Sequence, residues 1–308
     1  MLKMTLNQAI LELDLSPRAG FLVKSGDKGS NLLHPEHSDL GPLRTRVRRG
    51  PDGAIEDTVF IPGSTLKGVF RSAGERALRS LDDRYACDPH HKDTPCQRGP
   101  RERDASTADR HKALCLACRL FGSQQAAGRI QFSDALPPLG NDKAWAAANR
   151  TSTRSGVSID RLTGGPARGK LFEAEIVTAG TFRALLSLDN VQLWQLGLLG
   201  LLVEDLDAGE LRIGSGRTRG LGAFTVKVKR LDYWQVGAHP APLGVGALRP
   251  DLAGPYGWLA EPSLTGLPEG TPHRAGRRWR WETDAEARAA LSSVVATAWP
   301  PERALGAA

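Results

Sequence analysis

The cysteines are the residues of this chain whose type and spacing most clearly predict chemistry. All four of the chain's cysteines lie between Cys87 and Cys118. Cys115 and Cys118 are separated by two residues, which places two thiolates on one tight turn, where they can take adjacent corners of a Zn²⁺ tetrahedron. Because four protein ligands leave no open position for a substrate, we predict a structural zinc site formed by Cys87, Cys96, Cys115 and Cys118.

Two other interpretations of this cysteine group remain open. The spacing between Cys87 and Cys96 is looser than in a zinc ribbon, so a nearby histidine could replace one thiolate. The candidate histidines are His90, His91 and His111. The cysteines could also be free thiols or form disulfides, although an intracellular setting disfavours disulfides.

A glycine turn with hydroxyls and a lysine precedes the first predicted helix. Residues 61–68 read Ile-Pro-Gly-Ser-Thr-Leu-Lys-Gly, and Ser64 or Thr65 could accept hydrogen bonds from the free N–H groups of the first helical turn. Backbone N–H groups and the helix dipole at such an end favour a phosphate, and Lys67 would add positive charge. The spacing is not that of a Walker A loop, and a plain helix cap would explain the same residues.

A second glycine-rich segment, residues 214–222, reads Gly-Ser-Gly-Arg-Thr-Arg-Gly-Leu-Gly. Its glycines let the backbone approach a ligand closely, and Arg217 and Arg219 offer bidentate contacts to phosphate. The segment lacks the spacing of a dinucleotide-binding fingerprint and leads into a strand rather than a helix. We therefore predict that this loop contacts an RNA backbone.

Residues 149–170 are basic, rich in glycine and poor in apolar side chains, which indicates a protruding hairpin. Its apolar residues Val157, Ile159 and Leu162 are too few to bury it. An arm of this composition is either disordered or lies on a partner. The arginines that could contact such a partner are Arg154, Arg161 and Arg168.

The hydrophobic pattern predicts the elements that must position these residues. Apolar residues at helical spacing indicate an amphipathic helix over 65–81 and a largely buried helix over 191–206. Strands are expected over 9–15, 128–135, 172–176 and 182–188, and from 224 onward. The order is strand, helix, strand, then strand, strand, helix, strand, with long insertions, which is close to a βαββαβ unit and predicts an α+β fold with a ferredoxin-like (RRM-like) core.

Long insertions interrupt this predicted core. Residues 16–58 form a long loop, residues 82–122 hold the cysteines and residues 149–170 form the hairpin. We expect a core domain over 1–235 and a C-terminal extension over 236–308, and the chain shows no internal sequence repeat.

The composition is that of a folded protein with excess positive charge. Hydrophobic residues make up 40% and charged residues 24% of the chain, and the formal net charge is +7. Such an excess attracts polyanions, because neutralising phosphates releases condensed counterions. No stretch approaches the roughly 18 consecutive apolar residues of a membrane span, and the N-terminus has no signal-peptide core. We therefore expect a soluble, cytoplasmic protein with no membrane partner.

These segments, in this order, resemble the RAMP superfamily of CRISPR-associated proteins. More narrowly, they are similar to the repeated backbone (palm–thumb) subunit of type III RNA-guided effector complexes, and the resemblance covers about residues 5–230. The segments that carry it are Ile61-Pro62-Gly63-Ser64-Thr65-Leu66-Lys67-Gly68, Cys115-Leu-Ala-Cys118-Arg-Leu-Phe121-Gly122, Gly128-Arg129-Ile130-Gln131-Phe132-Ser133-Asp134-Ala135, Gly156-Val-Ser-Ile159-Asp160-Arg161-Leu-Thr163-Gly164 and the glycine loop 214–222.

The resemblance implies an RRM-like core whose copies stack along a guide RNA (crRNA) and push a thumb hairpin between guide and target. The expected partners are guide RNA, complementary target RNA, further copies of the chain and other RAMP subunits of an antiviral ribonucleoprotein complex. Carried onto this sequence, the RNA contacts would come from Ser64, Thr65, Lys67 and Arg71 on the first helix, from Arg217 and Arg219 on the glycine loop, and from Arg154, Arg161 and Arg168 on the thumb.

The resemblance also implies metal-dependent cleavage of the target RNA by an aspartate in the loop before the Ile-Pro-Gly motif. A carboxylate there can hold Mg²⁺ while the 2′-hydroxyl attacks the phosphate. Asp39 stands shortly before Pro42 and is the predicted catalytic residue, and Asp27 is the second candidate.

Other functions remain open at this stage. The chain could be a catalytically inactive guide-binding subunit of the same kind of complex, or a stand-alone endoribonuclease that processes guide RNA. A zinc-ribbon protein that binds duplex DNA is a further alternative.

Overall fold

The computed structural model describes residues 4–24, 40–49, 53–88, 90–91, 93–99, 105–259, 261, 263–265, 267–274 and 278–301. These residues form a mixed α+β fold in which every named strand pairs antiparallel with its neighbours. The predicted α+β class is therefore confirmed. None of the described helices is both long and apolar enough to cross a membrane.

The main sheet has six strands in the order β4-β7-β1-β8-β10-β9. Its centre is β1, in which Leu11 lies opposite Leu186 of β7 and Leu231 of β8. The strand bounds are β1 Asn7–Pro17, β4 Ile130–Phe132, β7 Phe182–Asp189, β8 Phe224–Val236, β9 Thr271–His273 and β10 Arg278–Thr283.

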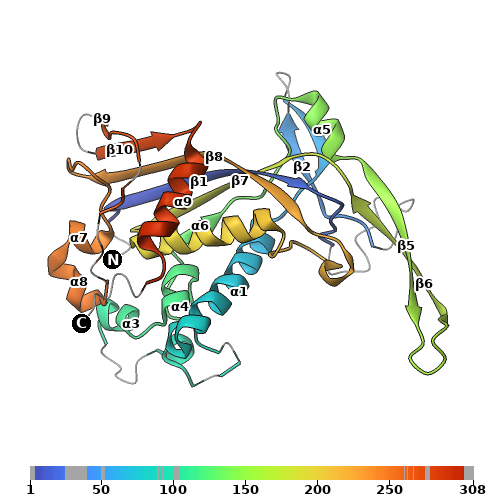
Figure 1. Cartoon of the computed structure of the whole chain (residues 1–308), viewed down its shortest axis with the longest axis horizontal. Coiled ribbons are helices and arrows are strands. Elements are labelled where there is room, and N and C mark those ends of the chain that lie inside the picture. The colour runs from blue at the N-terminus through green and yellow to red at the C-terminus, as the bar shows by residue number, and fades with distance from the viewer. Residues whose placement is uncertain are drawn as a thin grey trace.

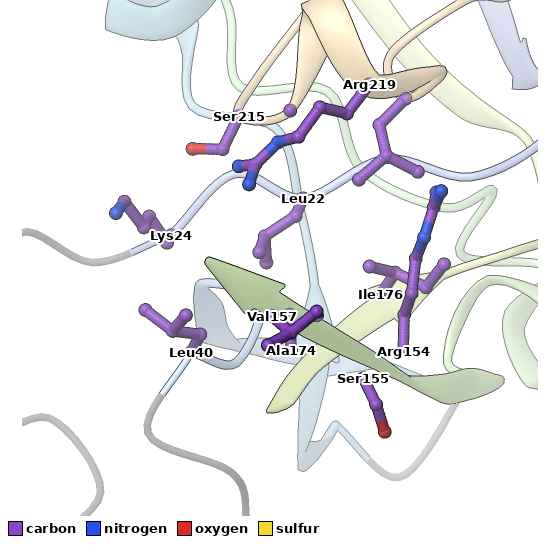
Figure 2. Close-up of a pocket in the computed structure, with 13 residues that line it drawn as sticks. Leu22, Lys24, Leu40, Arg154, Ser155, Val157, Ala174, Ile176, Ser215 and Arg219 are labelled. Carbon is purple, nitrogen blue, oxygen red and sulfur yellow. The ribbon is translucent and has the colours of Figure 1, made fainter. Parts of the chain in front are cut away.

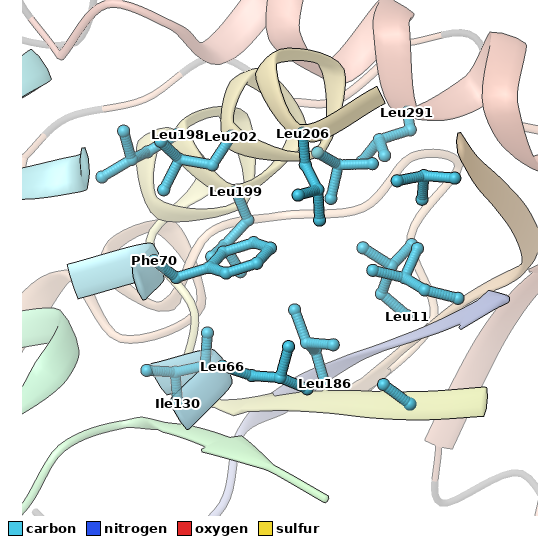
Figure 3. Close-up of a cluster of buried hydrophobic side chains, with 14 of the residues drawn as sticks. Leu11, Leu66, Phe70, Ile130, Leu186, Leu198, Leu199, Leu202, Leu206 and Leu291 are labelled. Atoms are coloured by element: carbon cyan, nitrogen blue, oxygen red, sulfur yellow. The ribbon is translucent and has the colours of Figure 1, made fainter. Parts of the chain in front are cut away.

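One face of this sheet is covered by three helices, α1 (Gly63–Leu81), α6 (Leu193–Ala208) and α9 (Ala287–Ala298), which lie on the same side in Figure 1. Alternate residues of β1, among them Leu11, point into the core beneath them and are 1% exposed. Phe70 of α1 and Leu199 of α6 meet the sheet residue Leu186 there (Figure 3). The two predicted helices thus correspond to α1 and α6, because their apolar faces need this sheet for burial.

The opposite face of the sheet carries ion pairs. Arg183 Nε of β7 lies 2.8 Å from Asp14 Oδ1, and Arg230 Nε of β8 lies 3.6 Å from Glu12 Oε2. These acids alternate along β1 with the buried leucines, so strand periodicity separates the apolar core from a charged outer face.

Two separate hairpins project from the sheet. The first is made of β2 (Arg44–Arg49) and β3 (Ala54–Val59), and the second of β5 (Thr151–Ile159) and β6 (Pro166–Val177). The β5–β6 hairpin extends away from the body of the molecule (Figure 1). Near its end Ile159 is 58% exposed and Leu162 is 95% exposed, so these two apolar side chains are not buried by the rest of the hairpin.

Short helices complete the fold. The cysteine-bearing insertion contains the 3₁₀ helix η1, and a second such helix, η2, lies in the glycine loop. Their bounds are η1 Asp83–Tyr85, α2 Pro95–Arg98, α3 Thr107–Lys112, α4 Leu116–Phe121, α5 Asp142–Ala148, η2 Arg217–Arg219, α7 Val245–Leu248 and α8 Pro250–Tyr256.

The C-terminal segment is joined closely to the rest of the chain. Strand β10 pairs with β8, and α9 packs on α6, so both belong to the layers of the main sheet. The carboxylate of Glu261 accepts a hydrogen bond from the backbone N–H of Trp194 at 2.7 Å, which satisfies the N-terminus of α6. The predicted division of the chain at residue 235 stays a prediction, but the two parts share one sheet.

Glu261 makes stability depend on pH. Burial raises the pKa of Glu261 to about 7 from its ordinary value of 4.5. Glu261 therefore binds a proton more tightly in the folded state than in the unfolded state. Its contribution to the free energy of unfolding is complete below about pH 4.5 and is lost as the pH rises to about 7. We expect Glu261→Gln to remove this pH-dependent decrease in the free energy of unfolding, which amounts to about 3 kcal/mol at most.

The measurement is the free energy of urea unfolding from pH 5 to pH 8. The wild-type protein should weaken more than Glu261→Gln over that range, while the exposed Glu269→Gln should follow the wild type. Parallel curves for the wild type and Glu261→Gln would contradict the assignment.

Candidate metal centre and nucleic-acid interface

The four cysteines come together in the insertion next to α1. The Sγ atoms of Cys87, Cys96, Cys115 and Cys118 all lie within 4.8 Å of one another, and Cys87 Sγ is 3.7 Å from Cys118 Sγ. A tetrahedral zinc with Zn–S bonds of about 2.3 Å requires S···S separations of about 3.8 Å. All four thiols are free of disulfides, so the donor set and its size fit a zinc ion.

Local backbone geometry holds this arrangement. Cys115 is the N-cap of α4, and its sulfur accepts hydrogen bonds from the N–H of Cys118 at 3.4 Å and of Cys87 at 3.4 Å. The sulfur of Cys96 accepts from the N–H of Cys115 at 3.3 Å. Such N–H···S contacts stabilise thiolates, the form that binds a metal.

The Cys87 thiol would resist ionisation without a cation. Burial first, and then the neighbouring sulfurs of Cys115 and Cys96, raise the pKa of Cys87 to about 12. A divalent cation would reverse this penalty, because it pairs with each thiolate and offsets their mutual repulsion. The cluster is therefore suited to a structural metal ion.

The candidate histidines do not join this group in the described part of the chain. His111 instead lies between Tyr256 and Arg129, with Nδ1 3.0 Å from the carbonyl of Tyr256 and Nε2 3.0 Å from Arg129 Nη2. A carbonyl only accepts and a guanidinium only donates, so Nδ1 carries the proton. Burial lowers the pKa of His111 to about 3, which keeps it neutral.

A groove forms where the glycine loop meets the base of the β5–β6 hairpin (Figure 2). It encloses about 210 Å³ and has an apolar floor with a cationic rim. Arg219 and Lys24 reach it from one side and Arg154 from the other. The residues that line it are Leu22, Lys24, Leu40, Arg154, Ser155, Gly156, Val157, Ala174, Ile176, Ser215, Gly216, Arg219 and Leu221.

The glycines of the loop are required by its conformation. Gly214 and Gly222 have φ of 91° and 83°, a region that favours glycine. A Cβ on Gly214 would lie 2.5 Å from the carbonyl oxygen of Leu22, and one on Gly222 would lie 2.3 Å from that of Ile213. The loop therefore packs directly on backbone, which places Arg217 and Arg219 on the exposed 3₁₀ turn η2.

The N-terminus of α1 differs from the prediction. Pro62 is the N-cap residue, and neither Ser64 nor Thr65 caps the helix. Instead, Asp134 Oδ1 accepts a hydrogen bond from the N–H of Gly63 at 2.7 Å. The expectation of a local hydroxyl cap was wrong, because this carboxylate already satisfies the first free N–H group and complements the helix dipole.

The structure separates the remaining predicted site residues. Ser64 is exposed, and neither it, Thr65 nor Lys67 lines the groove. Arg71 faces the cysteines, and Arg161 is exposed at the end of the β5–β6 hairpin. The side chain of Arg168, and Asp27 and Asp39 with the rest of residues 25–39, lie outside the described residues. The residues on either side of that segment, Lys24 and Leu40, both line the groove.

Sequence reasoning missed two contributors. Lys24 lines the groove with Arg154 and Arg219, but nothing in its local sequence distinguishes it from a surface lysine. Asp134 caps α1 from the segment 128–135, whose strand β4 spans only Ile130–Phe132. The sequence feature that could have identified Asp134 is its position just after a predicted strand, in the segment 128–135 that carries the family resemblance.

The geometry thus combines a four-cysteine centre with a basic groove on an α+β scaffold. Family models match residues 40–225 to the RAMP superfamily, which is more than half of the chain. The chain therefore belongs to the RAMP superfamily of CRISPR-associated proteins, and this membership indicates an RNA-binding role. A comparison with curated proteins finds no match.

Loss of one thiolate should empty the cysteine centre. We expect Cys118→Ser to lower bound zinc from about one ion per chain to a small fraction of that, and to lower the melting temperature by several degrees, because metal binding is coupled to folding of the insertion. Metal content by mass spectrometry and melting by circular dichroism measure the two effects.

The exposed Thr107→Ala on α3 of the same insertion is the control and should keep both values. A Cys118→Ser protein that retained one zinc ion and the wild-type melting temperature would show that Cys118 is not a ligand.

Proposed function

We propose that the chain is a backbone subunit of a type III CRISPR effector complex, which binds guide RNA and cleaves complementary target RNA at regular intervals. The observation that carries this proposal is the groove. It joins the glycine loop, the base of the β5–β6 hairpin and the residues that flank segment 25–39, three parts of the chain that the resemblance assigns to RNA.

The sheet order supports a ferredoxin-like core. The strands β4, β7, β1 and β8 are neighbours in that order, with α1 between β1 and β4 and α6 between β7 and β8 along the chain. In a βαββαβ unit this order corresponds to second, third, first and fourth strand, all antiparallel. The cysteine-bearing insertion, both hairpins and the C-terminal segment are then additions to that unit.

The chemistry of the groove favours backbone contact. Its cationic residues are Lys24, Arg154 and Arg219, and none of its described lining residues is aromatic. Guanidinium groups bind phosphate oxygens through paired hydrogen bonds and do not read base identity there. Contacts of this kind suit a guide RNA of any sequence.

The β5–β6 hairpin fits the role of a thumb. It projects from the body and exposes Val157, Ile159 and Leu162 together with Arg161. Apolar side chains beside positive charge can lie against bases while an arginine meets the backbone. We propose that this arm enters between guide and target, and that further copies of the chain and other RAMP subunits stack along the same guide in the cytoplasm.

We propose Asp39 as the catalytic residue, with Asp27 as the second candidate. Asp39 directly precedes Leu40, whose carbonyl accepts a hydrogen bond from the N–H of Glu175 in β6 at 3.0 Å. This contact ties the end of the segment to the base of the hairpin beside the groove. A Mg²⁺ ion held by the carboxylate would stabilise charge on the phosphate while the target's 2′-hydroxyl attacks.

Arg154 and Arg219 should each contribute one phosphate contact. We expect Arg154→Ala and Arg219→Ala to weaken binding of single-stranded guide RNA, and each to reduce the slope of log K against log salt by about 1. Arg249→Ala, at the N-cap of α8, changes a partly exposed arginine paired with Asp251; it is the matched control and should keep the wild-type slope. Unchanged slopes in both groove variants would remove the groove from the RNA interface.

Catalysis is tested in the assembled complex with guide, matched target RNA and Mg²⁺. Asp39→Ala should slow target cleavage by more than about 100-fold, because even an outer-shell partner of a metal contributes about 10–100-fold. Target binding should persist, and Asp27→Ala should cleave normally. If Asp39→Ala cleaves at the wild-type rate, Asp39 is not the catalytic residue. If the wild-type complex binds target and leaves it intact, the chain is a structural guide-binding subunit.

A further inference from the structure

Arg71 connects the first helix of the core to the cysteine centre. Its Nε donates to Glu75 Oε1 at 2.7 Å, one turn further along α1. Its Nη1 donates to the carbonyl of Gly122 at 3.1 Å, and its Nη2 donates to Cys118 Sγ at 3.8 Å. The guanidinium therefore lies between a carboxylate of its own helix and the Cys115–Cys118 turn with its helix α4.

The charge of a four-thiolate zinc centre explains why a cation belongs there. Zn²⁺ with four thiolates carries a net charge of −2, and here it would lie in a partly buried site where Cys96 and Cys118 are 2% exposed. Backbone N–H groups offset part of this charge. Arg71 adds a full positive charge directly on one sulfur, and charge-assisted hydrogen bonds of this kind are stronger than neutral ones.

Other arginines near the cysteines donate to backbone carbonyls, as Arg79 Nη2 of α1 does to that of Cys87 at 3.1 Å. Arg119 of α4 donates to the backbone carbonyls of Leu114, Lys112 and Gly257, at 2.9, 2.8 and 2.6 Å. It fixes the turn before α4 and ties it to the C-terminal segment. Among the described side chains outside the cysteines, only Arg71 donates a hydrogen bond to a sulfur of the cluster.

Packing makes the link between α1 and α4 rigid. A Cβ on Gly74 of α1 would lie 3.1 Å from the ring of Phe121 in α4, so the two helices are in direct contact at this point. Phe121 is 2% exposed and belongs to the main core. A displacement of α4 after metal loss would therefore be felt by α1 through both Phe121 and Arg71.

We propose that Arg71 is an outer-sphere residue of the metal centre, which retains the ion by stabilising the Cys118 thiolate and couples metal occupancy to the position of α1. This role differs from the predicted RNA contact of Arg71, which stays a prediction. Outer-sphere partners of metal ligands typically contribute 10–100-fold to metal affinity. The inference depends on the cysteine centre alone and not on the proposed ribonuclease function.

The test is the rate at which the zinc-loaded full-length chain gives up Zn²⁺ to a chromogenic chelator. Arg71→Ala should release zinc about 10-fold faster than the wild type, or more. Arg71→Lys, which keeps the charge but not the fork of N–H groups, should lie in between. Arg76→Ala, an exposed arginine of the same helix, is the matched control and should release zinc at the wild-type rate.

Cobalt provides a spectroscopic readout that a general loss of stability would not mimic. In the Co²⁺-loaded chain, the sulfur-to-cobalt charge-transfer band should shift to lower energy in Arg71→Ala, because a thiolate without its cationic partner donates an electron more readily. The band of Arg76→Ala should stay in place. Glu75→Gln, which leaves Arg71 without its carboxylate, should shift the band less than Arg71→Ala.

Two results would overturn the proposal. One is wild-type zinc release and an unshifted cobalt band in both Arg71→Ala and Arg71→Lys. The other is an Arg71→Ala protein that retains zinc normally but lowers the salt dependence of RNA binding by about one phosphate contact, which would make Arg71 part of the RNA interface. If Asp39 proved not to be the catalytic residue, the zinc-release and cobalt measurements would be unaffected, because they depend on the cysteine centre alone.

Discussion

The fold depends on the burial of α6 on all sides. Over its first two turns this helix is buried around its whole circumference, because every residue from Leu193 to Gly200 is buried. A helix of this kind must be covered by protein everywhere. The sheet and α1 cover part of it, and α9 from the C-terminal segment covers another part. The last part of the chain is therefore a structural requirement of the core.

Two glycines of α6 make that cover tight. A Cβ on Gly200 would lie 2.4 Å from Val295 Cγ2 of α9, and one on Gly197 would lie 3.0 Å from the backbone nitrogen of Trp299. Glycine costs about 1 kcal/mol relative to alanine inside a helix, so the close approach of α9 offsets a local penalty. The sequence marks α6 as buried, but it does not say which segment buries it, because that contact joins residues nearly 100 positions apart.

The elements that could be predicted are those with a local cause. Alternation in β1 and helical spacing in α1 each identify a buried face without knowledge of the partner. The cysteine spacing likewise predicts that Cys115 and Cys118 share a turn. By contrast, Asp134 caps α1 from 71 residues away, and β10 joins the sheet through pairs such as Arg280 with Asp232. Long-range contacts of this kind leave no periodic signal, so neither the Asp134 cap nor strand β10 could be predicted from the local sequence.

The groove likewise combines features that can be predicted from the local sequence with contacts that cannot. The glycine loop and the hairpin arginines are visible as segments, but only the fold brings Arg219 within reach of the cavity that Arg154 and Lys24 also line. Ser64 and Lys67 resemble a phosphate site in sequence, yet the α1 terminus already has Asp134 as its acceptor. Residue type therefore identifies candidates, while the partner already present decides which of them can meet a ligand.

Arginine use extends this argument to the net charge. The excess of +7 suggests a polyanion partner, but many arginines are committed within the protein. Arg129 is 4% exposed and donates to the carbonyl of Asn190, Arg119 holds backbone carbonyls, and Arg49 lies over the ring of Trp145 at 4.7 Å. An internal arginine neutralises no phosphate and releases no counterion. The charge that we propose to contact RNA is the smaller set on the groove and the hairpin, so the position of each guanidinium carries more functional information than the number of arginines.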